Sequence, residues 1–162
     1  MVTEPYRIGG AETEADIAAV AALLQAYADS LGVDLGYQDF AAELAALPGK
    51  YAAPNGALLL ARGPDGAALG CVGLRPLDAG GCCEMKRLYV APSGRGTRLG
   101  RALIEAVVAE ARRIGYREVR LDTLPFMHAA MALYDAMGFV PIPPYYETPV
   151  AGTRFLALSL AT

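Results

Sequence analysis

The residues best suited to chemistry lie in one stretch, where a strand meets a turn rich in arginine and glycine and then a helix. The strand is predicted from residue 84 and stops before Pro92, and the turn reads Arg-Gly-Thr-Arg-Leu-Gly over residues 95–100. The first N–H groups of a helix have no partner within it, and they lie at the positive end of the helix dipole. This turn is therefore predicted to bind an anion, phosphate above all.

The net charge of the chain and the positions of its Lys and Arg residues indicate which kind of anion this turn binds. The chain has 162 residues, a formal net charge of −3 and a pI near 5.1, which disfavours a general nucleic-acid binder. Nine of its 14 Lys and Arg residues nevertheless lie between Lys86 and Arg120, whereas the first 49 residues contain only Arg7. A local basic site on an acidic protein suits a small polyanion better than DNA, so we expect no nucleic-acid partner.

Other patterns exclude further classes of protein. Cys71, Cys82 and Cys83 lack the spacing of a disulfide framework or a zinc site, and His128 is the only histidine, so no metal site is expected. Hydrophobic residues make up 54% of the chain, which excludes disorder. No apolar run approaches the roughly 20 residues of a membrane span, and the N-terminus lacks a signal-peptide core. We expect one domain over residues 1–162, located in the cytoplasm, with no membrane partner.

Apolar periodicity and turn residues predict the elements that position the anion-binding turn. Strands are predicted near residues 6–8, 57–62, 67–75, 82–90, 118–123, 140–146 and 153–160, and helices near 14–31, 40–47, 99–114 and 129–137. This order predicts an α+β fold, a mixed sheet with helices on both faces. The strand–helix–strand unit over 82–123 is expected to be a parallel crossover.

Two segments resemble the signatures of the GNAT N-acetyltransferases. Leu-Tyr-Val-Ala-Pro at 88–92, followed by the turn at 95–100, is similar to the acetyl-CoA motif Arg/Gln-x-x-Gly-x-Gly/Ala. Residues 130–139, Ala-Met-Ala-Leu-Tyr-Asp-Ala-Met-Gly-Phe, resemble the second signature, an Ala-x-x-Leu-Tyr helix that ends in Gly-Phe. Both occur in the family's order and separation. The resemblance implies a mostly antiparallel sheet of about seven strands, splayed between strands 4 and 5 and flanked by about four helices.

The resemblance also implies that acetyl-CoA is the co-substrate and lies in the splayed opening. The backbone of residues 88–90 would pair with the pantetheine arm, and the N–H groups of the turn would hold the pyrophosphate. The residues that match the cofactor motif are Leu88, Tyr89, Val90, Arg95, Gly96, Thr97, Arg98, Leu99, Gly100 and Arg101.

Two positions depart from the family pattern. Arg98 stands where the family usually has glycine. If that position requires a positive φ, arginine costs energy there. Its guanidinium either adds a contact to a CoA phosphate or is solvated in the first turn of the helix. Met127 stands where many members have an asparagine that contacts the cofactor.

The implied reaction is acetyl transfer from acetyl-CoA to a primary amine of a small molecule, or to an exposed amino group, by direct attack in a ternary complex. Glu84 is the expected base, because some members carry a glutamate there and because it shares strand parity with Leu88 and Val90. An ion pair of Glu84 with Lys86 or Arg87 is the alternative. Tyr134 matches the family's general acid toward the CoA sulfur, and a purely structural core tyrosine is its alternative.

In this family the acceptor lies between the turn joining the first two helices and the loop between the last strands, here residues 30–37 and 141–152. Asp34 and Glu147 are candidates to attract a cation, and Tyr145 and Tyr146 offer ring faces. A rigid connector is the alternative reading of the loop, and these residues do not identify the acceptor amine. A catalytically weak CoA-binding sensor or partner module of the same fold is the second hypothesis, and a homodimer is left open.

Overall fold

Seven strands form one mixed sheet in the computed structural model, which describes residues 5–32 and 34–160. Their order across the sheet is β1-β2-β3-β4-β5-β7-β6, and β4 and β5 are the parallel neighbours. The strands are β1 (Arg7–Gly10), β2 (Ala57–Arg62), β3 (Ala68–Pro76), β4 (Cys82–Val90), β5 (Glu118–Thr123), β6 (Val140–Pro141) and β7 (Arg154–Ser159). The predicted mixed, mostly antiparallel sheet is confirmed.

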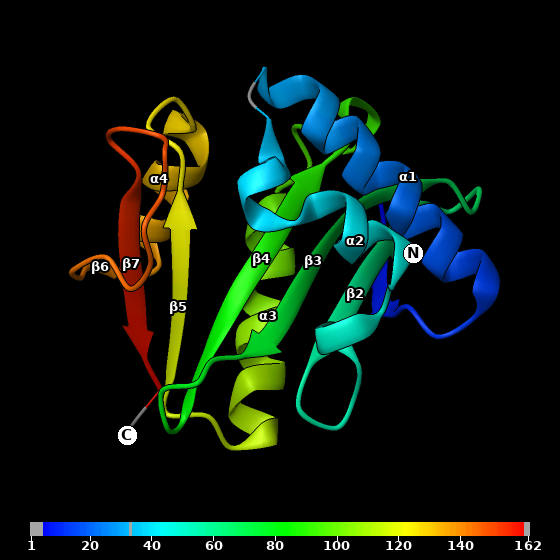
Figure 1. The fold of residues 1–162 in the computed structure, drawn as a ribbon. Helices are drawn as coiled ribbons and strands as arrows, with labels where there is room; N and C mark the ends of the chain where they lie inside the picture. Colours follow the sequence, from blue (N-terminus) through cyan, green and yellow to red (C-terminus); the bar gives the residue numbers. More distant parts are fainter. Residues whose placement is uncertain (1–4, 33, 161–162) are drawn as a thin grey trace.

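Four α-helices cover the two faces of this sheet (Figure 1). They are α1 (Glu14–Leu31), α2 (Phe40–Ala45), α3 (Leu99–Ile114) and α4 (His128–Ala136), with short 3-10 helices at Leu35–Gln38, Gly49–Tyr51 and Pro92–Gly94. Local sequence explains the helix ends: Thr13 and Asp16 form a capping box at the start of α1, and Gly115 ends α3 with a φ of 108°. That left-handed backbone favours glycine.

Each face of the sheet has its own apolar core. Under α3 and α4 the buried side chains include Leu103, Ile104 and Val107 from α3, together with residues of β2–β5 and β7. Under α1 and α2 a smaller cluster joins Val20, Leu24 and Phe40 to the opposite face of the sheet. Both helical layers are therefore fixed to the sheet by apolar packing, which is the main favourable term in folding.

The parallel pair β4–β5 is splayed, as predicted. It pairs only through Cys82–Glu118, Cys83–Val119 and Glu84–Arg120, and beyond these residues the two strands diverge toward the top of Figure 1. The remaining part of β4 is bonded to β3 on one side and has no strand on its other side within the described residues. An unpaired strand edge presents N–H and C=O groups that need partners.

A β-bulge interrupts β4 at Arg87. Between the pairs Gly73–Lys86 and Cys71–Tyr89, β3 contributes one residue and β4 contributes two. Arg87 adopts a φ of 62°, a left-handed conformation that residues other than glycine rarely take. One extra residue in a strand moves all later side chains to the opposite face of the sheet.

This bulge corrects the prediction that Glu84 shares a face with Leu88 and Val90. Leu88 and Val90 pack against the core under α3, whereas Glu84 and Lys86 line a cavity with residues of α2. The prediction was wrong because side chains alternate between faces only while a strand is uninterrupted.

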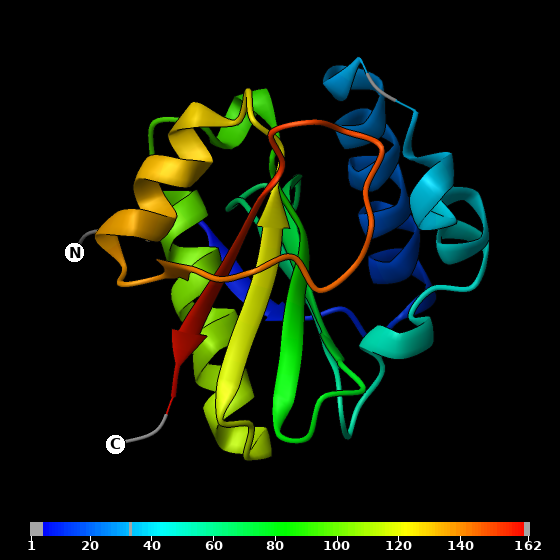
Figure 2. The ribbon, with the colours of Figure 1, turned by 60° about the vertical axis from the view of Figure 1, so that its left-hand side comes forward.

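The predicted strand over residues 140–146 is also shorter than expected. Pairing with β7 ends after Pro141, although the Ile142 N–H still donates to the Phe155 carbonyl at 2.9 Å. Pro143 and Pro144 follow, and proline has no N–H to continue the ladder. The chain from Ile142 onward instead crosses the sheet toward α1 and α2 (orange in Figure 2).

The side chain of Arg87 ties α2 to this bulge. Its Nε and Nη2 donate to the two carboxylate oxygens of Glu43 at 2.8 and 3.2 Å, and its guanidinium lies 5.0 Å from the centre of the Phe40 ring. The two charged side chains are 3% and 12% exposed. Removing one partner of a bidentate pair this well buried would leave the other charge buried without its counter-charge, which destabilises the fold.

Glu43→Ala is expected to lower the free energy of unfolding by about 3 kcal/mol, because Arg87 would be left buried without its main partner. Glu110→Ala, which removes the partner of the exposed Arg113, is the matched control and should cost less than about 1 kcal/mol. Urea denaturation near neutral pH measures both changes. Equal losses in the two variants would show that the Arg87 pair does not stabilise the fold.

The same pair predicts a pH dependence. Burial by itself raises the pKa of Glu43, but the hydrogen bond and charge of Arg87 outweigh it, so the net pKa is lowered from 4.5. The stabilisation is therefore fully present above pH 4.5 and is lost as the pH falls through the lower folded-state pKa. The stability difference between wild type and Glu43→Ala should shrink in acid. A difference that stays constant down to about pH 3 would contradict this assignment.

Candidate active site

The opening between β4 and β5 holds a cavity of about 440 Å³, which we call the cleft cavity. One wall is the unpaired part of β4. Tyr27 of α1 also lines the cavity, and its ring centre lies 5.7 Å from that of Tyr89. The other walls come from Asp122 at the end of β5 and from Tyr134 of α4. Four elements, α1, β4, β5 and α4, thus meet where the sheet splits.

Tyr134 lies near the C-terminal end of α4, and its ring centre is 5.6 Å from that of Phe139. The residue is 6% exposed. Burial raises the pKa of its hydroxyl, and electrostatic interactions with Tyr27 and Asp122 raise it further. A tyrosine with a raised pKa is fully protonated at neutral pH, so this hydroxyl is available as a proton donor.

The start of α3 borders a hollow of about 540 Å³, which we call the loop hollow. No side chain in the described part of the chain caps this helix, so its first N–H groups are left for water or a ligand. Val90, Arg95, Gly100 and Leu133 line both the loop hollow and the cleft cavity. The two spaces therefore adjoin, and an anion held at the helix start would belong to a molecule that continues into the cleft.

Arg98, the residue before α3, has a φ of 63° and a ψ of 21°. The position therefore requires the left-handed conformation, and a residue other than glycine is strained there by roughly 1 kcal/mol. The exposed side chain of Arg98 borders the loop hollow. Of the two consequences expected for this arginine, the backbone strain is present.

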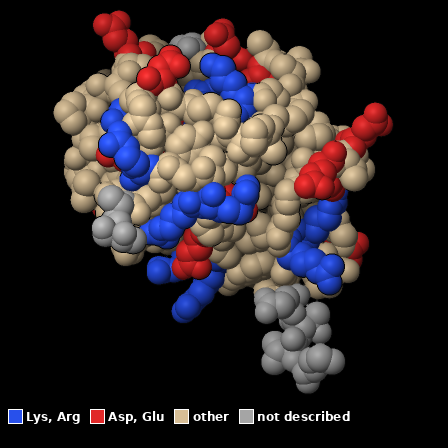
Figure 3. Space-filling model, turned by 90° about the horizontal axis from the view of Figure 1, so that it is seen from below, with Lys and Arg blue, Asp and Glu red and all other residues tan. Residues whose placement is uncertain are grey.

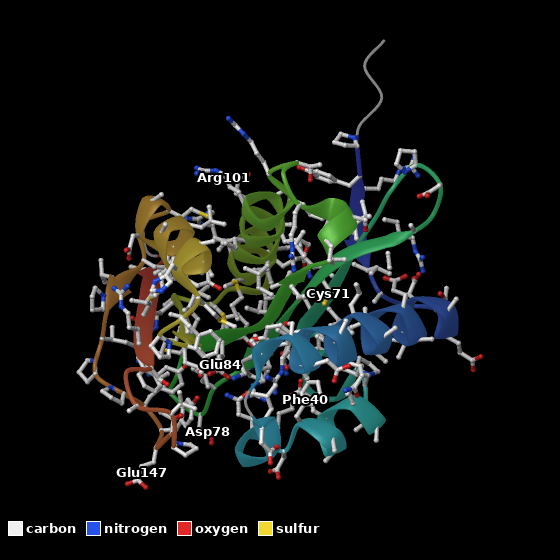
Figure 4. The ribbon with its side chains drawn as sticks, turned by 90° about the horizontal axis from the view of Figure 1, so that it is seen from above. Phe40, Cys71, Asp78, Glu84, Arg101 and Glu147 are labelled. Atoms are coloured by element: carbon white, nitrogen blue, oxygen red, sulfur yellow. The ribbon has the colours of Figure 1, made fainter. Side chains whose placement is uncertain are left out.

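The other residues of the predicted cofactor motif border these two spaces, with one exception. All but Thr97 line the cleft cavity or the loop hollow. The Thr97 hydroxyl instead donates to the Gly94 carbonyl at 2.6 Å and so holds the turn together. Arg101 pairs with Glu105 at 2.9 Å on the exposed surface of α3, on the opposite side of the sheet from Glu84 (Figure 4).

Glu84 does not line the cleft cavity. It is 2% exposed, and its Oε1 accepts a hydrogen bond from Arg75 Nε at 2.9 Å while its Oε2 accepts one from the Tyr145 hydroxyl at 2.5 Å. It lines a neighbouring cavity of about 600 Å³, which we call the side cavity. The structure therefore separates Glu84 from Tyr134, and the partner of its carboxylate is Arg75 rather than Lys86 or Arg87.

Lys86 and Gln38 line both cavities, so they mark the place where the two meet. The Lys86 ammonium donates to Asp122 Oδ1 at 3.2 Å and to Gln38 Oε1 at 3.4 Å. The hydroxyl of Tyr146 donates to the second oxygen of Asp122. Lys86 and Asp122 are 6% and 7% exposed, and Asp122 is the carboxylate that shares the cleft with Tyr134.

Sequence reasoning missed Lys86 and Asp122 as site residues. A signal for Asp122 was present in β5, where Glu118, Arg120 and Asp122 occupy every second position between buried residues. Charges on one face of a central strand mean that this face borders a polar space. Lys86 gave no comparable signal, because its neighbours in sequence are also charged.

The four predicted acceptor residues do not all come together. Tyr145 and Tyr146 line the side cavity. The side chain of Asp34 accepts a hydrogen bond from the Gly36 N–H at 2.8 Å and caps the short helix that follows. Glu147 is exposed and points away from the molecule (Figure 4). Val33, in the predicted acceptor turn, lies outside the described residues.

Positive and negative side chains are mixed on one face of the molecule (Figure 3). Lys and Arg side chains alternate with Asp and Glu on the face shown in Figure 3 rather than forming one basic patch.

Among the residues that the structure describes, no group of three or more His, Cys, Asp or Glu side chains is arranged to hold a metal ion. No helix within residues 5–32 and 34–160 is long and apolar enough to cross a membrane.

The sequence of this chain is similar to those of known acetyltransferases. The sequence model of the acetyltransferase (GNAT) family matches residues 18–139. An uncharacterised N-acetyltransferase of Schizosaccharomyces pombe is 40% identical over 86% of this chain and 85% of its own length.

Solved structures agree with the sequence matches. A candidate acyl-CoA N-acyltransferase of Klebsiella pneumoniae is 31% identical, with a TM-score of 0.73 over 98% of this chain and all (100%) of its own. The Salmonella typhimurium protein yncA, solved with its cofactor acetyl-CoA, shares the fold at 22% identity, with a TM-score of 0.64 over 97% and 95% of the two chains. The chain described here belongs to the GNAT acetyltransferase family.

Proposed function

We propose that this protein transfers the acetyl group of acetyl-CoA to a primary amine of a small molecule or to an exposed amino group, in a ternary complex. The observation that carries the proposal is the continuity of the loop hollow with the cleft cavity. This path leads from the uncapped start of α3 to the protonated hydroxyl of Tyr134. It matches a ligand that has phosphates at one end and a reactive group at the other.

The residues around this path fit acetyl-CoA. The first N–H groups of α3 would hold the pyrophosphate, and the backbone of Leu88 and Val90 offers the free edge of β4 to the pantetheine arm. The Val90 carbonyl also accepts a hydrogen bond from Arg95 Nε at 3.2 Å, which fixes the side chain of Arg95 between the two spaces. When bound, acetyl-CoA supplies a thioester whose acetyl carbon is open to attack by an amine.

Tyr134 and Asp122 are the groups of this chain that would move protons. In the transfer a C–N bond forms, the C–S bond breaks, and the hydroxyl of Tyr134 gives its proton to the departing sulfur. The proton of the amine must go to a base. Both oxygens of Asp122 and both oxygens of Glu84 accept a hydrogen bond. Asp122 shares the cleft with Tyr134, whereas Glu84, the base expected from the sequence, lies in the side cavity. We therefore assign the base to Asp122, acting directly or through a water.

The proposed function is tested in two steps. Acetyl-CoA should raise the melting temperature of the protein, as any ligand of the folded state does, and free thiol should then appear when an amine from a panel is added. Absence of stabilisation by acetyl-CoA near saturation would overturn the proposal. Stabilisation without thiol release from any small amine or peptide N-terminus would instead support a CoA-binding sensor.

Tyr134→Phe is expected to lower kcat by about 10²- to 10⁴-fold, the usual contribution of a general acid, while the affinity for acetyl-CoA changes little. Calorimetric titration and thiol release measure the two quantities on the same preparation. A variant that loses acetyl-CoA binding along with turnover would make Tyr134 a structural residue.

Asp122→Asn and Glu84→Gln distinguish the two candidate bases. Removing the true base should abolish the rise of kcat/KM with pH on the acidic limb of the profile. We expect this change in Asp122→Asn, and an essentially unaltered profile shape in Glu84→Gln. The opposite result would return the role to Glu84, acting through Tyr145.

Arg98→Gly tests both consequences of the unusual arginine. Glycine relieves the left-handed strain but is more flexible when unfolded, so the net gain in stability should be roughly 0.5 kcal/mol. Arg98→Ala removes the guanidinium and keeps the strain, which makes it the matched control. If the guanidinium contacts a CoA phosphate, both variants lose acetyl-CoA affinity by about tenfold. Wild-type affinity in both would leave only the backbone effect.

A further inference from the structure

The side cavity is the space from which an acceptor can reach the cleft. It adjoins the cleft cavity at Lys86 and Gln38, and its volume of about 600 Å³ is in the range of small-molecule sites. Its walls come from α2, from the faces of β3 and β4 that point toward α2, and from Tyr145 and Tyr146. The chemistry of these walls therefore bears on which amine enters. The inference below rests on the proposed function.

Arg75 presents an incompletely used guanidinium to this cavity. Its Nε donates to Glu84 at 2.9 Å, but its Nη1 lies 3.8 Å from Glu43 Oε1, which is too long for a hydrogen bond. Among the described residues its terminal nitrogens have no hydrogen-bond acceptor, although its side chain is only 27% exposed. A planar fork of N–H groups suits the two oxygens of a carboxylate.

Lys86 places a second positive charge at the entrance to the cleft. Its ammonium has three N–H groups, and the described residues supply acceptors for two of them, Asp122 and Gln38. Asp122 offsets the charge of Lys86 toward an arriving amine, and the third N–H group of Lys86 remains to bind an anionic oxygen of the acceptor.

The charges around the side cavity are balanced. Three carboxylates and three cations line it, namely Asp39, Glu43, Glu84, Lys50, Arg75 and Lys86. Glu43 pairs with Arg87 and Lys86 pairs with Asp122, and both partners lie outside this set. An anionic group on the acceptor would therefore be held by the N–H groups that Arg75 and Lys86 still offer, and not by a surplus of positive charge.

We propose that the acceptor is an amino carboxylate of the α-amino acid type, whose carboxylate binds Arg75 and Lys86 in the side cavity. Its amine then points past Lys86 into the cleft. Tyr51, Tyr145 and Tyr146 also line this cavity, and their rings give the amino acid side chain an apolar surface to contact. The site thus recognises a zwitterion rather than a simple amine or a polyamine.

The proposal is tested with matched pairs of acceptors that differ only in the carboxylate, such as phenylalanine with phenethylamine and leucine with isoamylamine. With acetyl-CoA and thiol detection, kcat/KM should be about ten- to a hundredfold higher for the amino acid, the usual effect of a charge-assisted contact. Equal values within each pair would overturn the amino-carboxylate proposal and leave the acetyltransferase proposal standing.

Binding gives a second readout that does not depend on turnover. Calorimetric titration of the CoA-saturated protein should detect the preferred amino acid and should not detect its decarboxylated partner. Binding of neither, or equal binding of both, would overturn the amino-carboxylate proposal. Amino acid binding without thiol release would uphold it and count against acetyl transfer.

A variant of Arg75 connects the preference to its guanidinium. Arg75→Lys keeps a partner for Glu84 but loses the fork, and it should reduce the ratio of kcat/KM within a pair by about tenfold. Lys50→Gln, at an exposed position on the rim, removes a cation that is not assigned to the carboxylate and should reduce the ratio by less. Arg113→Gln, on the exposed surface of α3, is the control. An unchanged ratio in folded Arg75→Lys would exclude Arg75 as a carboxylate ligand and overturn the assignment.

Discussion

The short pairing between β4 and β5 is the constraint on which the rest of the structure depends. Because the two strands are bonded only as far as Glu84 and Arg120, the rest of β4 keeps a backbone edge without a strand partner in the described chain. Backbone groups in the interior need hydrogen bonds. The opening is held apart by apolar layers on both faces of the sheet, so it is a stable part of the fold and a place for an extended ligand.

Buried ion pairs, rather than apolar contacts, line the border between the two cavities. Lys86–Asp122, Arg75–Glu84 and Arg87–Glu43 join α2 and the centre of the sheet. The hydroxyls of Tyr145 and Tyr146, in the loop after β6, donate to Glu84 and Asp122 of these pairs. Well-packed apolar side chains at such positions are often at least as stabilising as ion pairs. Their presence at the point where two cavities meet therefore fits a role in positioning substrates and setting local charge.

Much of the fold was predictable because it depends on local signals. The apolar positions of α3, the capping box at Thr13 and the glycine at 115 each act within a few residues. The prediction failed where a local pattern was interrupted. The predicted alternation of side chains along β4 failed at Arg87, because the residues next to it give no sign of a bulge. The strand predicted after Gly138 ended at Pro141, because the prolines that follow cannot continue the ladder.

The sequence by itself determined the order of elements and the family, and it predicted the turn at 95–100 as an anion site, since these follow from residue types within single segments. Only the tertiary structure decided which carboxylate shares a cavity with Tyr134. The bulge at Arg87 and the splay of β5 bring Asp122 into the cleft, while Arg75 and Tyr145 hold Glu84 in the side cavity. Such placement depends on contacts between residues up to 61 positions apart in the chain, which no local pattern encodes.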